Sequence, residues 1–143
     1  MSPGTKRYVC GFYRERGTNN VLLIQKLKPD WQRGKHNGIG GSVESGENVY
    51  EAMVREFREE ATVETEEKDW FLRVNLIGED KTWEVYFFVA DGPRAVESVD
   101  SNEGLIEWHD TRDLPDSVIP NLKWLIPLCF DSDIRAPLTM VSK

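Results

Sequence analysis

Long hydrophobic runs are missing from this sequence of 143 residues, of which 39% are hydrophobic and 30% are charged. A membrane-spanning helix needs about 20 consecutive apolar residues, and no run approaches that length. The opening segment MSPGTKRYVC also lacks the apolar stretch of a signal peptide. We therefore expect a cytoplasmic protein. The length suits one hydrophobic core, so we expect a single domain over residues 1–143.

Cysteine is scarce as well. Cys10 and Cys129 lie near opposite ends of the chain, outside any Cys-x-x-Cys motif or cysteine–histidine cluster. The sequence therefore has no pattern that indicates a structural zinc site or a disulfide-stabilised fold. We expect both cysteines to be buried, reduced thiols.

An excess of basic charge is also absent, because the formal net charge is −7. This argues against a surface that coats a nucleic acid polymer, and we expect neither such a polymer nor a membrane as partner. The charge is unevenly distributed: residues 44–69 are strongly acidic, whereas residues 1–40 contain more basic than acidic side chains. An acidic segment therefore follows directly on a basic one.

Apolar alternation predicts several strands. Residues 8–14 and 21–25 are short apolar runs separated by a segment rich in glycine and asparagine, which predicts a β-hairpin. Residues 81–90 alternate as a strand does, and residues 71–77 form a weaker strand before them.

Two segments have helical spacing, and no internal repeat or linker divides the chain. Residues 48–61 contain neither glycine nor proline, whereas Pro120 and Pro127 limit the regularity of a helix over 117–130. The glycines of residues 31–46 predict a structured loop there. A mixed sheet flanked by helices, an α/β fold, accounts for this pattern.

The helix predicted over 48–61 places acidic residues beside its apolar stripe. At about 100° per residue, Glu56 and Glu60 fall among the apolar side chains and Glu59 lies at their border. Ordinary surface charge is the alternative. Carboxylates this close to a core repel one another unless a cation neutralises them, and Mg²⁺ or Mn²⁺ prefers such oxygen ligands.

These glutamates belong to a longer pattern. Gly41 is followed after five residues by Glu47 and after seven more by the segment REFREE at 55–60, and Val63 closes the pattern. It resembles the Nudix box, Gly-x5-Glu-x7-Arg-Glu-U-x-Glu-Glu-x-Gly-U, in which U is a bulky apolar residue. Thr62 stands where the family has a glycine suited to a left-handed helix cap, so we expect a different cap here.

The resemblance implies the Nudix fold, an α/β/α sandwich with a mixed β-sheet between helices, and MutT-like hydrolysis. It implies that Glu56, Glu59 and Glu60 hold Mg²⁺, with Mn²⁺ as a substitute. A backbone carbonyl of the glycine pair, Gly40 or Gly41, is implied as a further metal ligand.

Other residues acquire roles from the same resemblance. Glu47 and Arg55 match the pair that braces the loop of the box against its helix. Glu103 precedes Glu107-Trp108 much as an extra glutamate precedes Glu-Trp in MutT-type members, which makes it a candidate metal ligand or general base. A surface-loop acid is the alternative for Glu103. Glu56 and Glu103 both stay candidates for the base.

The segment 31–44 resembles the Trp-Asn-Gly-x-Gly-Gly-x-Val segment of animal enzymes that destroy oxidised purine nucleoside triphosphates, with His36 replacing the tryptophan. The resemblance implies that Asn37 contacts the base, since an amide both donates and accepts; a turn residue is the alternative. Asn121 loosely matches a base-contacting asparagine of the bacterial enzyme. Trp31 is a candidate for stacking on a base or for rim packing. Basic residues leading into the box are candidates for holding phosphate or are solvated charges: Arg7, Lys26, Lys28, Arg33 and Lys35.

We therefore predict a Mg²⁺-dependent pyrophosphohydrolase that converts a nucleoside triphosphate of the 8-oxo-dGTP type to a nucleoside monophosphate and pyrophosphate. An ADP-ribose or dinucleotide pyrophosphatase is the alternative enzyme, although such enzymes typically carry N-terminal dimerisation structure that we do not expect here. A nucleotide-binding module without catalysis is the other alternative, and the complete set of box glutamates argues against it. The partner is a small nucleotide, and the sequence leaves a monomer and a homodimer open.

Overall fold

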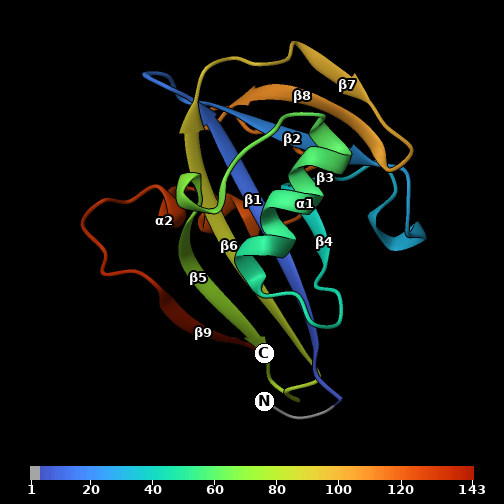
Figure 1. Cartoon of the computed structure of the whole chain (residues 1–143), viewed down its shortest axis with the longest axis vertical. Coiled ribbons are helices and arrows are strands. Elements are labelled where there is room, and N and C mark those ends of the chain that lie inside the picture. Colours follow the sequence, from blue (N-terminus) through green and yellow to red (C-terminus); the bar gives the residue numbers. More distant parts are fainter. Residues whose placement is uncertain (1–3) are drawn as a thin grey trace.

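The computed structural model describes residues 4–143, and its strands form one mixed sheet of nine strands (Figure 1). The strands are β1 (Lys6–Glu15), β2 (Asn20–Lys26), β3 (His36–Asn37), β4 (Ile39–Ser42), β5 (Phe71–Gly78), β6 (Trp83–Gly92), β7 (Ser98–Asp100), β8 (Gly104–Asp110) and β9 (Leu138–Ser142). The helices are α1 (Val49–Ala61) and α2 (Leu122–Cys129), with short 3-10 turns η1 (Asp30–Gln32) and η2 (Glu67–Asp69).

The sheet runs in the order β7-β8-β2-β1-β6-β5-β9, with β3 paired to β2 and β4 paired to β1. The pairs β1–β6 and β5–β9 are parallel, and the other pairs are antiparallel. β1 is therefore the centre of the sheet, and it lies directly beside the glycine-containing strand β4.

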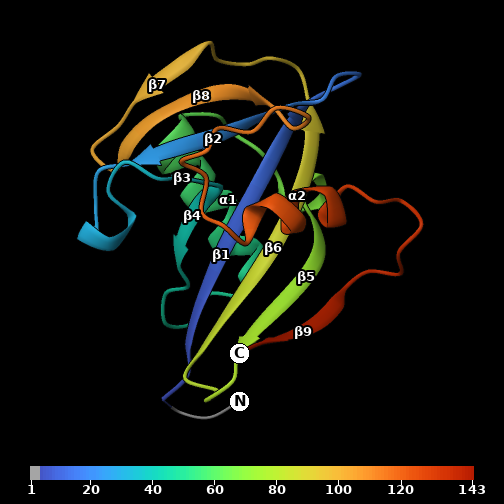
Figure 2. The same cartoon turned by 180° about the vertical axis from the view of Figure 1, so that it is seen from behind.

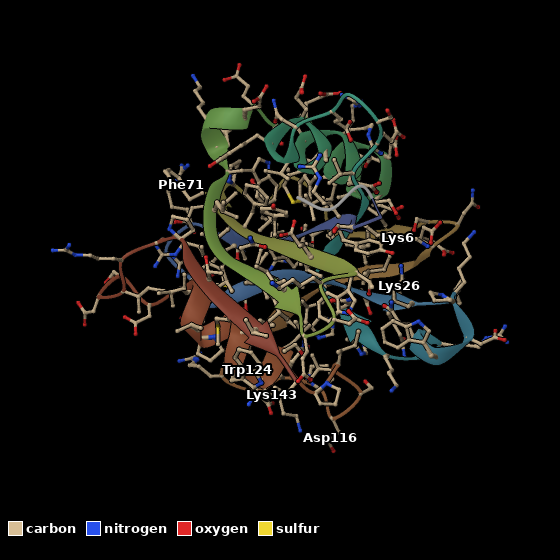
Figure 3. The ribbon with its side chains drawn as sticks, turned by 90° about the horizontal axis from the view of Figure 1, so that it is seen from below. Lys6, Lys26, Phe71, Asp116, Trp124 and Lys143 are labelled. Atoms are coloured by element: carbon tan, nitrogen blue, oxygen red, sulfur yellow. The ribbon has the colours of Figure 1, made fainter. Side chains whose placement is uncertain are left out.

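Two hydrophobic cores lie on the two faces of this sheet. Successive side chains of a strand point to opposite faces, so Val9 and Tyr13 pack in the core that includes α1, whereas Cys10 and Phe12 pack in the core that includes α2. Figures 1 and 2 show α1 over one face and α2 over the other, and Figure 3 shows the three layers from below. The predicted architecture, a mixed sheet between helices, is confirmed.

Most predicted elements are present with small changes at their ends. The hairpin is β1 and β2, the strands over 71–77 and 81–90 are β5 and β6, and the first helix is α1. Asn48 caps α1: its side chain accepts a hydrogen bond from the Glu51 amide at 2.9 Å, and the Glu51 carboxylate accepts one from the Asn48 amide at 2.9 Å. This reciprocal box satisfies two amides that a helix start otherwise leaves unpaired.

Two expectations need correction. The helix expected over 117–130 covers only Leu122–Cys129, because Pro120 precedes it and the backbone of residues 117–119 hydrogen-bonds to His36 of β3 instead. The loop expected over 31–46 contains β3 and β4, whose shortness and glycines hide them from periodicity.

α1 ends at a left-handed residue. Thr62 has φ 62° and ψ 21°, and its amide donates to the Arg58 carbonyl at 3.0 Å. The expectation of a different cap is therefore wrong: the helix keeps a left-handed cap, and threonine adopts it. This conformation costs an L-residue about 1–2 kcal/mol, and a β-branched residue is especially disfavoured there.

We expect Thr62→Gly to raise the free energy of unfolding by about 1 kcal/mol, since glycine adopts this conformation without the steric cost. Thr62→Ala keeps a Cβ at the same position and is the control, with a smaller gain. Urea unfolding of the three proteins measures the difference. A Thr62→Gly protein less stable than the parent would show that the Thr62 hydroxyl, which donates to the Ala61 carbonyl, outweighs the backbone strain.

No helix among residues 4–143 is long and apolar enough to span a membrane. Cys10 and Cys129 are both buried and free, as predicted.

Candidate functional site

Glu56 extends from α1 toward the glycine pair of β4, and its carboxylate lies against Gly41. Its side chain is only 12% exposed. A Cβ atom added to Gly41 would lie 2.6 Å from Glu56 Oε1 and 2.8 Å from Oε2, so glycine lets the carboxylate lie directly against the strand. The neighbouring Gly40 is paired with Cys10 of β1, which keeps β4 in place beside the helix.

Arg55 connects the loop before α1 to the helix. Its guanidinium donates to both carboxylate oxygens of Glu47, at 2.8 and 3.0 Å, and to the Ser42 carbonyl at 3.0 Å. It also donates to Glu56 at 2.9 Å and to Glu59 at 3.2 Å. These hydrogen bonds from Arg55 hold the pKa of Glu47 below its usual value. The bidentate contact joins the loop to the helix in a fixed geometry.

The loop between β7 and β8 contacts the end of α1 and the end of β2 through Ser101 and Glu103. Ser101 Oγ donates to Glu60 Oε2 at 3.3 Å, and the Glu103 amide donates to the same hydroxyl at 3.2 Å. The Glu103 carboxylate pairs with Lys28 at 3.4 Å and with Lys26 at 3.7 Å. The structure thus brings Glu103 to the glutamates of α1, although the two segments are far apart in the sequence.

The carboxylates at this place interact unfavourably with one another. Burial raises the pKa of Glu56, the hydrogen bond from Arg55 opposes this, and the negative charges of Glu59 and Glu103 add to the increase. Burial also raises the pKa of Glu60, and the charges of Glu103 and Glu56 add to it. A site in which burial and like charges both disfavour ionisation gains stability from a bound cation.

The donor set suits a hard divalent cation. The side chains of α1 supply carboxylate oxygens, and Gly41 of the adjacent strand β4 lies against one of them. Glu56 is the most constrained of these donors because it lies against Gly41. In the part of the chain that the structure describes, no three acidic, histidine or cysteine side chains already form a metal-ligand group. Arg55 and the two lysines instead provide the positive charge around them.

Asn37 and Asn121 are brought to the same part of the molecule by a short backbone contact. The His36 amide donates to the Ser117 carbonyl at 2.9 Å, and the Ile119 amide donates to the His36 carbonyl at 2.9 Å. Asn37 follows directly after this contact, and Asn121, the residue before α2, lies two residues beyond it in the chain. Within residues 4–143 the buried oxygen Oδ1 of Asn121 has no hydrogen-bond partner. A buried acceptor without a partner costs free energy, and the buried Oδ1 of Asn75 on β5 also lacks a partner among the described residues.

The side chain of Asn37 is held on three sides. Its Oδ1 accepts from the Gly38 amide at 2.8 Å and from Cys10 Sγ at 3.7 Å, and its Nδ2 donates to Gln32 Oε1 at 3.2 Å. Sequence reasoning missed the parts that Cys10, Gln32 and Ser101 take in this geometry. Their residue types carry no distinctive signal, and only the folded chain brings them to their partners.

The basic candidates lie on three segments: Arg7 on β1, Lys26 at the end of β2, and Arg33 and Lys35 on the loop before β3. Lys26 ends β2, and its backbone exchanges hydrogen bonds of 2.8 Å with Lys35 and Gly34 while its ammonium group faces Glu103. Figure 3 marks Lys26 at this end of the sheet. Arg33 and Lys35 are exposed on the loop that follows η1, and Trp31 on η1 is 64% exposed. Arg7 instead faces the start of the helix, where it donates to the Glu47 carbonyl at 3.5 Å.

A histidine pair supports the strand on which Asn37 lies. The rings of His36 and His109 are 4.9 Å apart, and His36 Nδ1 lies 2.7 Å from Ser117 Oγ. Burial lowers the pKa of both histidines below 6.5, and for His36 the charge of His109 adds to this, whereas Glu107 opposes it.

We expect acid to destabilise the protein through this pair. The unfolded chain binds more protons than the folded one between the ordinary and the lowered pKa, so the free energy of unfolding falls as the pH decreases from about 8 to about 5. His109→Gln should weaken that dependence, which urea unfolding at several pH values measures. Glu56 and Glu60 act in the opposite direction but are common to both proteins. An unchanged dependence in the variant would contradict the assignment.

Comparisons with known proteins agree on one family. The NUDIX domain matches residues 4–128. An uncharacterized Nudix hydrolase of Bacillus subtilis, YvcI, is 32% identical over 71% of this chain and 70% of its own length. The oxidized purine nucleoside triphosphate hydrolase of Danio rerio is 35% identical over 66% of this chain and 61% of its own length, so the match leaves out more than a third of that relative. A MutT protein from Bacillus halodurans shares the fold at 22% identity, with a TM-score of 0.71 over 96% of this chain and 90% of that one.

Proposed function

This chain belongs to the Nudix hydrolase family, and on that premise we propose that it hydrolyses a nucleoside triphosphate to a nucleoside monophosphate and pyrophosphate with Mg²⁺ as cofactor. The observation that carries the proposal is the pair of partly buried glutamates Glu56 and Glu60 on α1, where Glu56 lies against Gly41 and Ser101 links Glu60 to the loop of Glu103. Such a group of hard oxygen donors beside a basic strand end suits a phosphate-bearing substrate.

Glu56, Glu59 and Glu60 hold the divalent cation in this proposal, with Glu103 and a carbonyl of Gly40 or Gly41 as further donors. The cation, for which Mn²⁺ is a substitute, neutralises phosphate charge and polarises the phosphoryl group. Arg55 and Glu47 hold the loop before α1 against the helix, so the oxygen donors to the cation keep a fixed arrangement.

A carboxylate accepts the proton of the attacking water. Glu56 suits this role because burial raises its pKa toward the working pH, and a base is most effective there. Glu103 suits it because its loop faces the glutamates of α1 and its two lysine partners can turn to phosphate oxygens instead. Both are retained as candidates.

The substrate is an oxidised purine nucleotide of the 8-oxo-dGTP type. Asn37 and Asn121 provide amide groups for hydrogen bonds to a base edge, and Lys26, Arg33 and Lys35 provide positive charge for the phosphates. Trp31 is exposed beside these residues and offers a surface for stacking. The relative from Danio rerio, which acts on oxidized purine nucleoside triphosphates by its name, adds support.

A panel of substrates tests the proposal. Steady-state rates with Mg²⁺ are compared for 8-oxo-dGTP, the four ordinary deoxynucleoside triphosphates, ADP-ribose and diadenosine polyphosphates. We expect the largest kcat/KM for 8-oxo-dGTP and a clear excess over dGTP. A preference for ADP-ribose would overturn the substrate while leaving the metal site, and no turnover of any compound would favour a binding module.

A further inference from the structure

Cys10 is a buried thiol that contacts a residue of the proposed base site. It is 6% exposed, and its Sγ lies 3.7 Å from Oδ1 of Asn37 on β3, a strand that pairs with β2. A Cβ atom at Gly38 would lie 2.5 Å from the same sulfur. Glycine at this position therefore allows the backbone after Asn37 to lie against the thiol, so the contact is part of the packing of β1 against β3 and β4.

The thiol stays protonated at neutral pH. Burial raises the pKa of Cys10 to about 12, and the thiol group of Cys129 adds to this effect. A protonated thiol is a hydrogen-bond donor, although a weak one. Cys10 therefore offers its S–H to the oxygen of Asn37 under all conditions near neutrality.

The hydrogen bonds of the Asn37 amide have a definite direction. Its oxygen accepts from the Gly38 amide and from Cys10, which uses both of its lone pairs. Its nitrogen carries two N–H groups, and among the described residues only one of them is engaged, by Gln32. The group left for a ligand is therefore an N–H donor.

We propose that Cys10 is a positioning residue that holds the Asn37 amide with its oxygen inward and one N–H group directed to the substrate base. The base atom that meets Asn37 is then a hydrogen-bond acceptor. An amide turned by 180° would present its oxygen to the same atom and repel it. This inference rests on the proposed function in one respect, which is that Asn37 contacts the base.

Three substitutions test the positioning role. Cys10→Ala removes the donor, Cys10→Ser restores a donor in the same place, and Cys129→Ala removes a similar volume from the other buried thiol, which is 1% exposed and belongs to the same core as Cys10. We expect Cys10→Ala to raise KM for 8-oxo-dGTP about five- to tenfold with little change in kcat. Cys10→Ser should return KM toward the parent value, and Cys129→Ala should leave it unchanged although it lowers stability.

Nuclear magnetic resonance of the free protein gives a readout that does not depend on activity. The side-chain amide signals of Asn37, identified by their loss in Asn37→Asp, should move in Cys10→Ala and return in Cys10→Ser. Signals that are indifferent to both substitutions would overturn the positioning role, and so would equal KM values for the alanine and serine variants. If the signals respond while no nucleotide is hydrolysed, the proposed function fails and the positioning role stands.

Discussion

Replacing Glu59 by glutamine is expected to lower kcat for nucleotide hydrolysis by at least about 100-fold while nucleotide binding persists. The amide keeps the size of the side chain but loses its negative charge, so the site attracts a divalent cation less strongly and neutralises less of its charge. Glu59 is 53% exposed and its contact with Arg55 is at the surface, so the fold should tolerate the change.

Glu64→Gln is the matched control, because Glu64 is an exposed glutamate just beyond the end of α1. Steady-state assays give kcat for each variant, and calorimetric titration with a nonhydrolysable nucleotide gives its Kd. Together they separate an effect on the chemical step from an effect on binding. Turnover of the Glu59→Gln protein within a few-fold of the parent would remove Glu59 from the metal ligands. Loss of activity in both variants would point to a general effect of acidic charge.

Adding one methyl group at Gly41 should be almost as damaging. The Cβ of an alanine there would lie 2.6 Å from the Glu56 carboxylate, so that carboxylate must shift by about 1 Å. A displacement of this size at a reacting centre costs roughly 100-fold in rate. Gly41 does not have a positive φ, so the alanine itself fits the backbone and the effect falls on Glu56.

Gly4→Ala makes the same chemical change where nothing lies within 4 Å, and it should leave kcat unaltered. Thermal unfolding of both variants tests whether the fold is intact. If Gly41→Ala retains the parent kcat with an unchanged melting temperature, Glu56 is not held against the strand in the way that the structure indicates.

The acidic part of the site was accessible from the sequence because it is local. Glu56, Glu59 and Glu60 lie within two turns of one helix, and helical spacing alone places Glu56 and Glu60 among its apolar side chains and Glu59 at their border. Asn48 and the capping box explain why the helix begins where it does, and both signals are readable in the chain.

Contacts between distant segments were not accessible in the same way. The salt bridges of Lys26 and Lys28 with Glu103 require that β8 pairs with β2, and the contact of Cys10 with Asn37 requires that β3 and β4 fold back beside β1. Strands β7, β8 and β9 were not predicted. β7 and β9 lie at the edges of the sheet and alternate between intermediate and exposed residues, so they lack the apolar run that marks a central strand.

Product analysis of 8-oxo-dGTP hydrolysis tests the central claim most directly. Phosphorus magnetic resonance of the reaction is recorded with Mg²⁺, with EDTA in place of the metal, and with the Glu59→Gln protein. The account predicts pyrophosphate and 8-oxo-dGMP in equal amounts with Mg²⁺, neither product in EDTA, and at most about one hundredth of the parent rate of product formation with the Glu59→Gln protein. Release of inorganic phosphate in place of pyrophosphate, or equal turnover in EDTA, would contradict it.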